Sequence, residues 1–200
     1  MTQPGVYWLL DAPFMRVIGL YSNRLENPGY LEGRDAKGKV DQAQITWLQR
    51  TLSSIASDPE KKALVIATHH PPYSQGGHSG STEMSATIDA ACAAAAITPD
   101  LFLSGHAHNY QRYTRRINQK QVPYIVAGTG GISPQEVPAA SGQVVDPVNH
   151  VTFDAAHESY GYLLLSVSKS KIKIEFWVLN PPDHKAFETI AVDLSTGTVS

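Results

Sequence analysis

Two short apolar segments, each leading into a histidine, constrain the fold of this chain more than any other feature. Leu64 to Thr68 is a nearly continuous apolar run that ends at His69, and Leu101 to Ser104 leads through one glycine into His106. Runs of this kind are typical of strands buried on both faces of a parallel sheet. If the two strands are parallel neighbours, both histidines emerge at the same edge, where ligands bind in open α/β sheets.

The elements around these segments predict an α/β chain whose second half is mostly β. Periodicity and turn residues predict long loops over 23–38 and 131–149 and a turn over 180–183. Lys171, Lys173 and Glu175 alternate with apolar residues, which predicts a strand with one solvent-facing side. The order indicates two sheets packed face to face, with helices covering one of them. The predicted elements are strands 14–21, 62–68, 101–104, 122–127, 161–168, 171–179 and 187–194, a helix from Asp41 as N-cap to Asp58 that buries Ile45, Leu48, Leu52 and Ile55, and a helix over 81–97 that buries Met84, Ile88 and Cys92.

Composition indicates a single ordinary globular domain. The chain has 200 residues, of which 42% are hydrophobic and 17% charged, with a net charge of −2. This balance disfavours nucleic-acid binding through charge. Cys92 is the one cysteine, so no intrachain disulfide forms. No apolar run is long enough to span a membrane, and the N-terminus has no signal-peptide pattern, so the compartment stays unknown.

Three of the eight histidines are candidate metal ligands, namely His69, His106 and His108. His106 and His108 are two residues apart, so an extended backbone would point both rings to one side, and Gly105 would permit a tight approach. Neutral imidazole suits zinc, iron and manganese. His70 would point away from His69 and serve a structural role. His150, His157 and His184 are expected to be ordinary structural or surface residues.

These residues resemble a known family, the calcineurin-like metallophosphoesterases. His69-His70-Pro71-Pro72-Tyr73-Ser74 is similar to the family's His-x-Pro block, and Ser104-Gly105-His106-Ala107-His108 is similar to its Gly-His-x-His block. The continuation Asn109-Tyr110-Gln111-Arg112 resembles the purple acid phosphatase-like branch, as do residues 44–48, 128–131 and 160–163. The resemblance implies a four-layer α/β/β/α sandwich, of which residues 1–200 would be the C-terminal part and a single partial domain.

The resemblance also implies roles for individual residues. His69 and His106 would bind one metal ion and His108 the other, with iron, zinc or manganese as candidates. His78 would contact the phosphate and protonate the leaving group, although a histidine in a glycine-rich loop is often merely solvated. The ions would stabilise in-line attack of a hydroxide on phosphorus. Further residues would orient the site or line its cleft: His70, Tyr73, Asn109, Tyr110 and Arg112, of which the last two would brace the His106–His108 turn.

The family's Asp-x-His, Gly-Asp and Gly-Asn-His blocks are absent from the sequence. They would supply the bridging aspartate and two further ligands. Two divalent ions about 3.5 Å apart repel each other by roughly 19 kcal/mol at an effective dielectric near 20, and neutral imidazoles offset little of this. We therefore expect this chain alone to hold at most one weakly bound ion.

Three interpretations remain open at this level. The chain is the C-terminal part of a phosphatase that acts on a phosphate ester, a non-catalytic remnant that acts as an interaction module through an exposed sheet edge, or a hydrolase with a mononuclear histidine site. The absent strands would leave an unpaired edge and an exposed apolar face. We accordingly expect self-association or pairing with the missing N-terminal portion. Substrate and metal identity stay open.

Overall fold

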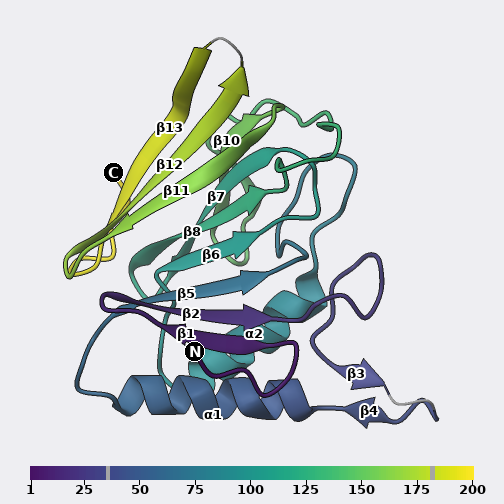
Figure 1. The fold of residues 1–200 in the computed structure, drawn as a ribbon, viewed down its shortest axis with the longest axis vertical. Helices are drawn as coiled ribbons and strands as arrows, with labels where there is room; N and C mark the ends of the chain where they lie inside the picture. The colour runs from purple at the N-terminus through teal and green to yellow at the C-terminus, as the bar shows by residue number, and fades with distance from the viewer. Residues whose placement is uncertain (35–36, 181–182) are drawn as a thin grey trace.

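Two β-sheets pack face to face at the centre of the computed structural model, which describes residues 1–34, 37–180 and 183–200 (Figure 1). The larger sheet has eight strands in the order β1-β2-β5-β6-β8-β7-β10-β9, and the smaller has three in the order β11-β12-β13. The strands of the larger sheet are β1 (Trp8–Asp11), β2 (Met15–Leu20), β5 (Ala63–Thr68), β6 (Leu101–Ser104), β7 (Tyr110–Ile117), β8 (Lys120–Ala127), β9 (Gln143–Asp146) and β10 (Val151–His157). Those of the smaller sheet are β11 (Gly161–Val167), β12 (Lys171–Asn180) and β13 (Asp183–Asp193).

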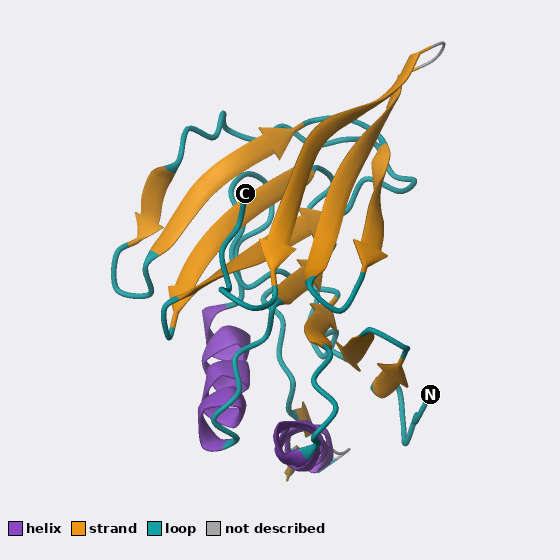
Figure 2. Cartoon of the chain, turned by 90° about the vertical axis from the view of Figure 1, so that its left-hand side faces the viewer, coloured by secondary structure: helices purple, strands orange, loops and turns teal. Residues whose placement is uncertain are grey.

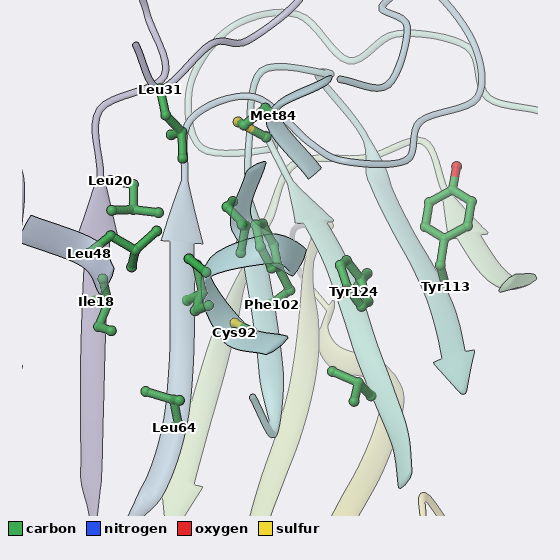
Figure 3. Packing of buried hydrophobic residues seen from close by; sticks show 14 of the residues in the cluster. Ile18, Leu20, Leu31, Leu48, Leu64, Met84, Cys92, Phe102, Tyr113 and Tyr124 are labelled. Atoms are coloured by element: carbon green, nitrogen blue, oxygen red, sulfur yellow. The ribbon is translucent and has the colours of Figure 1, made fainter. Parts of the chain in front are cut away.

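Strand β5 shows why the chain folds into layers. Its residues alternate in direction: Leu64 and Ile66 belong to the apolar cluster on the helix side, while Ala63 and Val65 belong to the cluster between the two sheets. All four are at most 2% exposed, which confirms the prediction that this strand is buried on both faces. Figure 3 shows part of the helix-side cluster, in which Leu64 and Phe102 lie on adjacent strands.

Two helices, α1 (Ala43–Ser57) and α2 (Thr82–Ala94), cover the outer face of the larger sheet in the described part of the chain (Figure 2). The predicted apolar faces are confirmed, because Leu48, Leu52 and Ile55 of α1 are buried, as are the three residues predicted for α2. Ile45, also predicted on the α1 face, is partly buried against the same cluster.

The start of α1 and the end of α2 differ slightly from the prediction. The N-cap of α1 is Gln42, and Asp41 instead accepts a hydrogen bond from the Ala43 N–H at 2.9 Å. Helix α2 ends at Ala94 rather than at Ile97. Ala96 adopts a left-handed φ of 51°, and the Ile97 N–H donates to the Cys92 carbonyl at 3.1 Å. This bond across a left-handed residue is the Schellman pattern that closes helices.

The smaller sheet differs from the prediction at one residue of the face that was expected to meet solvent. Its inner face is apolar as expected, with Ile172, Ile174 and Phe176 buried against the larger sheet. On the outer face Glu175 is only 9% exposed, because it lies opposite Leu164 and forms an ion pair with Lys173 at 2.9 Å. The prediction that Glu175 faces solvent is therefore wrong.

Several strands lie in segments where the sequence indicates none. β1, β7 and β10 have no predicted counterpart, β9 lies inside the predicted 131–149 loop, and β3 (Gly33–Arg34) pairs with β4 (Val40–Asp41) at the end of the 23–38 loop. The central prolines of the predicted 180–183 turn lie outside the described residues.

Among the described helices, none is long and apolar enough to cross a membrane.

Candidate metal centre

Adjacent ends of β5 and β6 bring the two histidine segments together. The strands pair in parallel, with Ala67 opposite Leu103, which confirms the neighbour relationship expected from the sequence. Just beyond the strands, the Gly105 N–H donates to the His69 carbonyl at 3.0 Å. The side chains then meet, with Nε2 of His69 3.0 Å from Nδ1 of His106. One hydrogen is shared between these two nitrogens.

The segment after β6 is a tight turn and not an extended strand. His106 has a left-handed φ of 67°, and the Ala107 and Asn109 N–H groups donate to the carbonyls two residues before them, at 2.8 and 2.9 Å. The prediction that an extended backbone aligns the rings of His106 and His108 is therefore wrong. The glycine that permits the close approach is Gly128, because a Cβ there would overlap the Ala107 carbonyl oxygen.

His70 is buried directly beside this pair, with its ring centroid 4.9 Å from that of His69 and 4.4 Å from that of His106, so the prediction that it points away from His69 is wrong. Its Nε2 lies 2.6 Å from the Glu26 carbonyl oxygen and its Nδ1 lies 3.0 Å from Oγ of Ser22. A carbonyl only accepts, so Nε2 carries the hydrogen and the Ser22 hydroxyl donates to Nδ1. Both ring nitrogens of His70 are thus already engaged.

Nitrogen atoms of His69, His70 and His106 all lie within 4.8 Å of one another, a grouping that could hold a metal ion. Since both nitrogens of His70 have partners, His69 and His106 are the better ligands of the three. Nε2 of His106 is buried without a hydrogen-bond partner, and a buried orphan nitrogen is costly unless a ligand satisfies it. The residues present therefore fit a metal ion.

Electrostatics keep this pair uncharged. Burial is the main cause that lowers the pKa of His106, and the neighbouring histidines, led by His70, lower it further, to about 4. The same causes lower the pKa of His69. At neutral pH both rings are therefore neutral, which is the state that binds metals. No carboxylate belongs to the group within the described residues.

His78 and His108 lie next to this centre. The His78 ring centroid is 4.3 Å from that of His106 and 5.7 Å from that of His108. The structure thus brings all four predicted histidines together, with His108 beside His78 and outside the group of three. Whether His108 binds a second ion stays a prediction.

The remaining predicted residues contact other parts of the molecule. Tyr73 packs in the helix-side core, with its ring centroid 5.3 Å from that of Tyr124, and burial raises its pKa. The Tyr110 hydroxyl donates to Glu188 at 2.6 Å, and Arg112 pairs with Glu188 and Asp154 at 2.8 and 3.0 Å. Tyr110 and Arg112 thus join the two sheets.

Hydrogen bonds to the histidine turn come instead from Gln135, a residue that no sequence pattern singles out. The Gln135 N–H donates to the His108 carbonyl at 2.9 Å, and its Oε1 accepts from the His108 N–H at 3.2 Å. Asn109 is fully buried and donates to the Gln135 carbonyl at 3.2 Å. The sequence patterns also miss Ser22, the hydrogen-bond partner of His70, although its position directly after a predicted strand is a signal.

An open cavity of about 790 Å³ adjoins this turn, lined by Gly76, Gly77, Gln135, Glu136, Val137, Pro138 and Glu158. It lies between the loop that carries His78 and the loop that carries Gln135.

Comparison with solved structures shows the fold. PhoD matches with a TM-score of 0.67 at 11% identity, covering 98% of this chain and 43% of that one. GAP50, the anchor in the inner membrane complex of Plasmodium, matches with a TM-score of 0.60 at 16% identity, covering 94% of this chain and 54% of that one. The chain thus spans about half the length of these proteins. No family model matches the sequence, and no curated protein matches it either.

The two likenesses agree with the expected fold class. The described residues form two packed sheets with helices on one outer face, as the order of elements predicts, and this mixed α/β fold is consistent with a metallophosphoesterase-like fold. The second helix layer of the α/β/β/α sandwich is not found among the described residues. At these identities the match concerns the fold alone.

Proposed function

We propose that this chain carries the histidine half of a metal-dependent phosphoric ester hydrolase site. The observation that carries the proposal is the pairing of His69 with His106 at the ends of two parallel strands, with ring nitrogens 3.0 Å apart. Both rings are held neutral by burial. Two neutral imidazoles on rigid strand ends suit a divalent ion better than they suit any acid or base role.

His69 and His106 would hold one ion, and His108 would serve a second where carboxylates complete the site. A bound ion would supply charge stabilisation to the phosphoryl oxygens and a nucleophilic oxygen. His78 lies close enough to the pair to donate a hydrogen bond to the phosphate and to protonate the leaving oxygen.

Charge balance limits the number of divalent ions that the isolated chain would bind. The described histidine group contains no carboxylate, so two divalent ions at this edge would repel each other with little compensation. We accordingly propose that the isolated chain binds one ion and that hydrolysis at full rate needs carboxylates from outside these residues.

A second candidate function rests on the outer face of the smaller sheet. Tyr162 and Leu164 of β11 and Leu179 of β12 lie on this face and are 41%, 45% and 49% exposed. Within the described residues no helix covers it (Figure 2). An exposed apolar sheet face is a common interaction surface, and GAP50, which has this fold, is an anchor. The chain would then act as an interaction module.

Metal-dependent phosphate binding tests the first proposal. The chain is loaded with zinc or manganese, inorganic phosphate is titrated in, and turnover of a chromogenic phosphate ester is followed in parallel. We expect phosphate binding that needs the metal, is lost in His106→Ala and is kept in His150→Asn. His150 is a suitable control because it lies on an exposed turn with a φ of 54°, which asparagine tolerates. Equal phosphate binding in His106→Ala, or none in the parent chain, would refute the proposal.

A further inference from the structure

Gln135 contacts the histidine site through four polar groups, more than any other residue of its loop. Its main-chain N–H and carbonyl hold His108 and Asn109, at 2.9 and 3.2 Å. Its side chain bridges two histidines: the amide oxygen Oε1 lies 3.2 Å from the main-chain nitrogen of His108, and the amide nitrogen lies 3.4 Å from the ring nitrogen Nε2 of His78. Gln135 is thus the one described residue that is hydrogen-bonded to both His78 and His108.

The orientation of the Gln135 amide follows from these contacts. The main-chain N–H of His108 is a donor, so the atom facing it has to be the amide oxygen. The amide nitrogen then faces His78, and an amide nitrogen donates but does not accept. The reversed amide would place two donors against each other at His108. The His78 nitrogen that faces Gln135 therefore acts as an acceptor.

The tautomer of His78 follows in turn. A neutral imidazole carries one hydrogen, so if Nε2 accepts, the hydrogen lies on Nδ1. No described residue is hydrogen-bonded to Nδ1 of His78. This N–H is accordingly free to donate to a ligand.

The loop that carries His78 is packed against the loop that carries Gln135. Gly76 has a φ of 100°, and a Cβ there would lie only 2.8 Å from the Glu136 carbonyl oxygen. Nearby, the Gln75 N–H donates to Oε1 of the buried Gln111 at 2.8 Å. The close approach at Gly76 places the two loops side by side, and the bond from Gln75 anchors the His78 loop to β7, so the contact between Gln135 and His78 is supported on both sides.

We propose that Gln135 is a positioning residue, which holds His78 as the Nδ1–H tautomer with Nδ1 as the atom that donates to a bound phosphate. The tautomer stands on the hydrogen bonds alone. The use of Nδ1 toward phosphate rests on the proposed function. If Gln135 only packed the loop, replacing its amide with a carboxylate would leave the tautomer of His78 unchanged.

Long-range proton–nitrogen NMR on the ¹⁵N-labelled full chain tests the tautomer, at an alkaline pH where imidazole rings are neutral. The His78 signals are assigned by their loss in His78→Gln. We expect a protonated Nδ1 and an unprotonated Nε2. In Gln135→Glu the carboxylate only accepts, so the hydrogen should move to Nε2. Gln49→Glu, the same charge change on the exposed side of α1, should leave it on Nδ1.

Two results would overturn the assignment: a hydrogen on Nε2 in the parent chain, or no change of tautomer in Gln135→Glu with the turn intact. Should that variant unfold the loop, Gln135→Asn keeps the main-chain bonds but is one methylene too short to span both histidines, and a mixture of tautomers is expected. Inorganic phosphate is then added to the zinc-loaded parent chain, where Nδ1 should shift more than Nε2. An Nδ1–H tautomer that depends on Gln135, with no phosphate shift, would refute the proposed function and support the positioning role.

Discussion

Nε2 of His69 lies 3.0 Å from Nδ1 of His106, although the two residues are 37 positions apart in the sequence. The contact exists because parallel pairing of β5 and β6 ends both strands at one edge, and because the bond from Gly105 to the His69 carbonyl fixes their offset. The histidine pair is thus a direct consequence of the sheet.

Gly128 sets the position of the His106 turn. A Cβ on Gly128 would overlap the Ala107 carbonyl oxygen and lie 2.8 Å from the Ala107 carbonyl carbon. Gly128→Ala should therefore displace the turn, lower metal occupancy several-fold and destabilise the fold by about 1–3 kcal/mol. Metal titration and urea unfolding would measure the two effects.

Gly131 provides the matched control, since a Cβ added at this position would have no other atom within 4 Å. Gly131→Ala should leave both metal occupancy and stability near those of the parent chain. Equal behaviour of the two variants would show that the turn does not depend on Gly128.

Arg112 links the two sheets through Glu188 and Asp154, and the three side chains are 12%, 18% and 18% exposed. Removing one partner of such a pair leaves a charge with little solvent, which typically costs about 3–5 kcal/mol. We expect a loss of about that size in Arg112→Met, measured by urea unfolding. In Arg112→Met/Glu188→Met the loss should be smaller. A single variant within about 1 kcal/mol of the parent would show that the pair contributes little.

Asp193 makes the stability of the C-terminal turn depend on pH. Hydrogen bonds from the Ser195 hydroxyl first, and then from the Thr196 N–H, lower the pKa of Asp193 from 3.8 to about 2. Between these two pKa values the unfolded chain binds more protons than the folded chain. The stability that Asp193 contributes is therefore complete above about pH 4 and is lost as the pH falls through about 2. Asp193→Asn should remove this part of the acid sensitivity in urea midpoints recorded over that range. An unchanged profile would contradict the assignment.

Apolar residues on the outer face of the smaller sheet predict self-association. Leu164 is 45% exposed and lies on the same face as Tyr162. Leu164→Lys should shift the chain toward monomer in light scattering at micromolar concentration. Val148→Lys, at a site 83% exposed on a loop, should have no effect. A parent chain that is already monomeric would count against this surface.

How far the sequence predicts the structure depends on where each signal lies. Continuous apolar runs predict β5 and β6 and the meeting of the histidines, because burial on both faces leaves few alternatives. Strand β7 escapes prediction because it buries Gln111 and Arg115, polar residues whose partners, such as Gln75 and Asp89, come from distant segments. Hydropathy patterns do not register such partners.

The sequence predicts the candidate ligands of the site but not the residues that support them. His69 and His106 follow predictable strands, whereas the left-handed φ of His106 and the bonds from Gln135 arise from tertiary contacts. Gln135 belongs to a loop with no periodic pattern, 27 residues from His108. Local sequence carries no information on that pairing.

Metal content tests the central claim most directly. The chain is stripped with a chelator, equilibrated with zinc, desalted and analysed for metal, together with His69→Ala, His106→Ala and His150→Asn. We predict one ion per parent chain and per His150→Asn chain, and a loss of about tenfold or more in affinity, about 1.4 kcal/mol, for His69→Ala and His106→Ala. Zinc retained equally by His106→Ala, or two ions held by the parent chain alone, would contradict it.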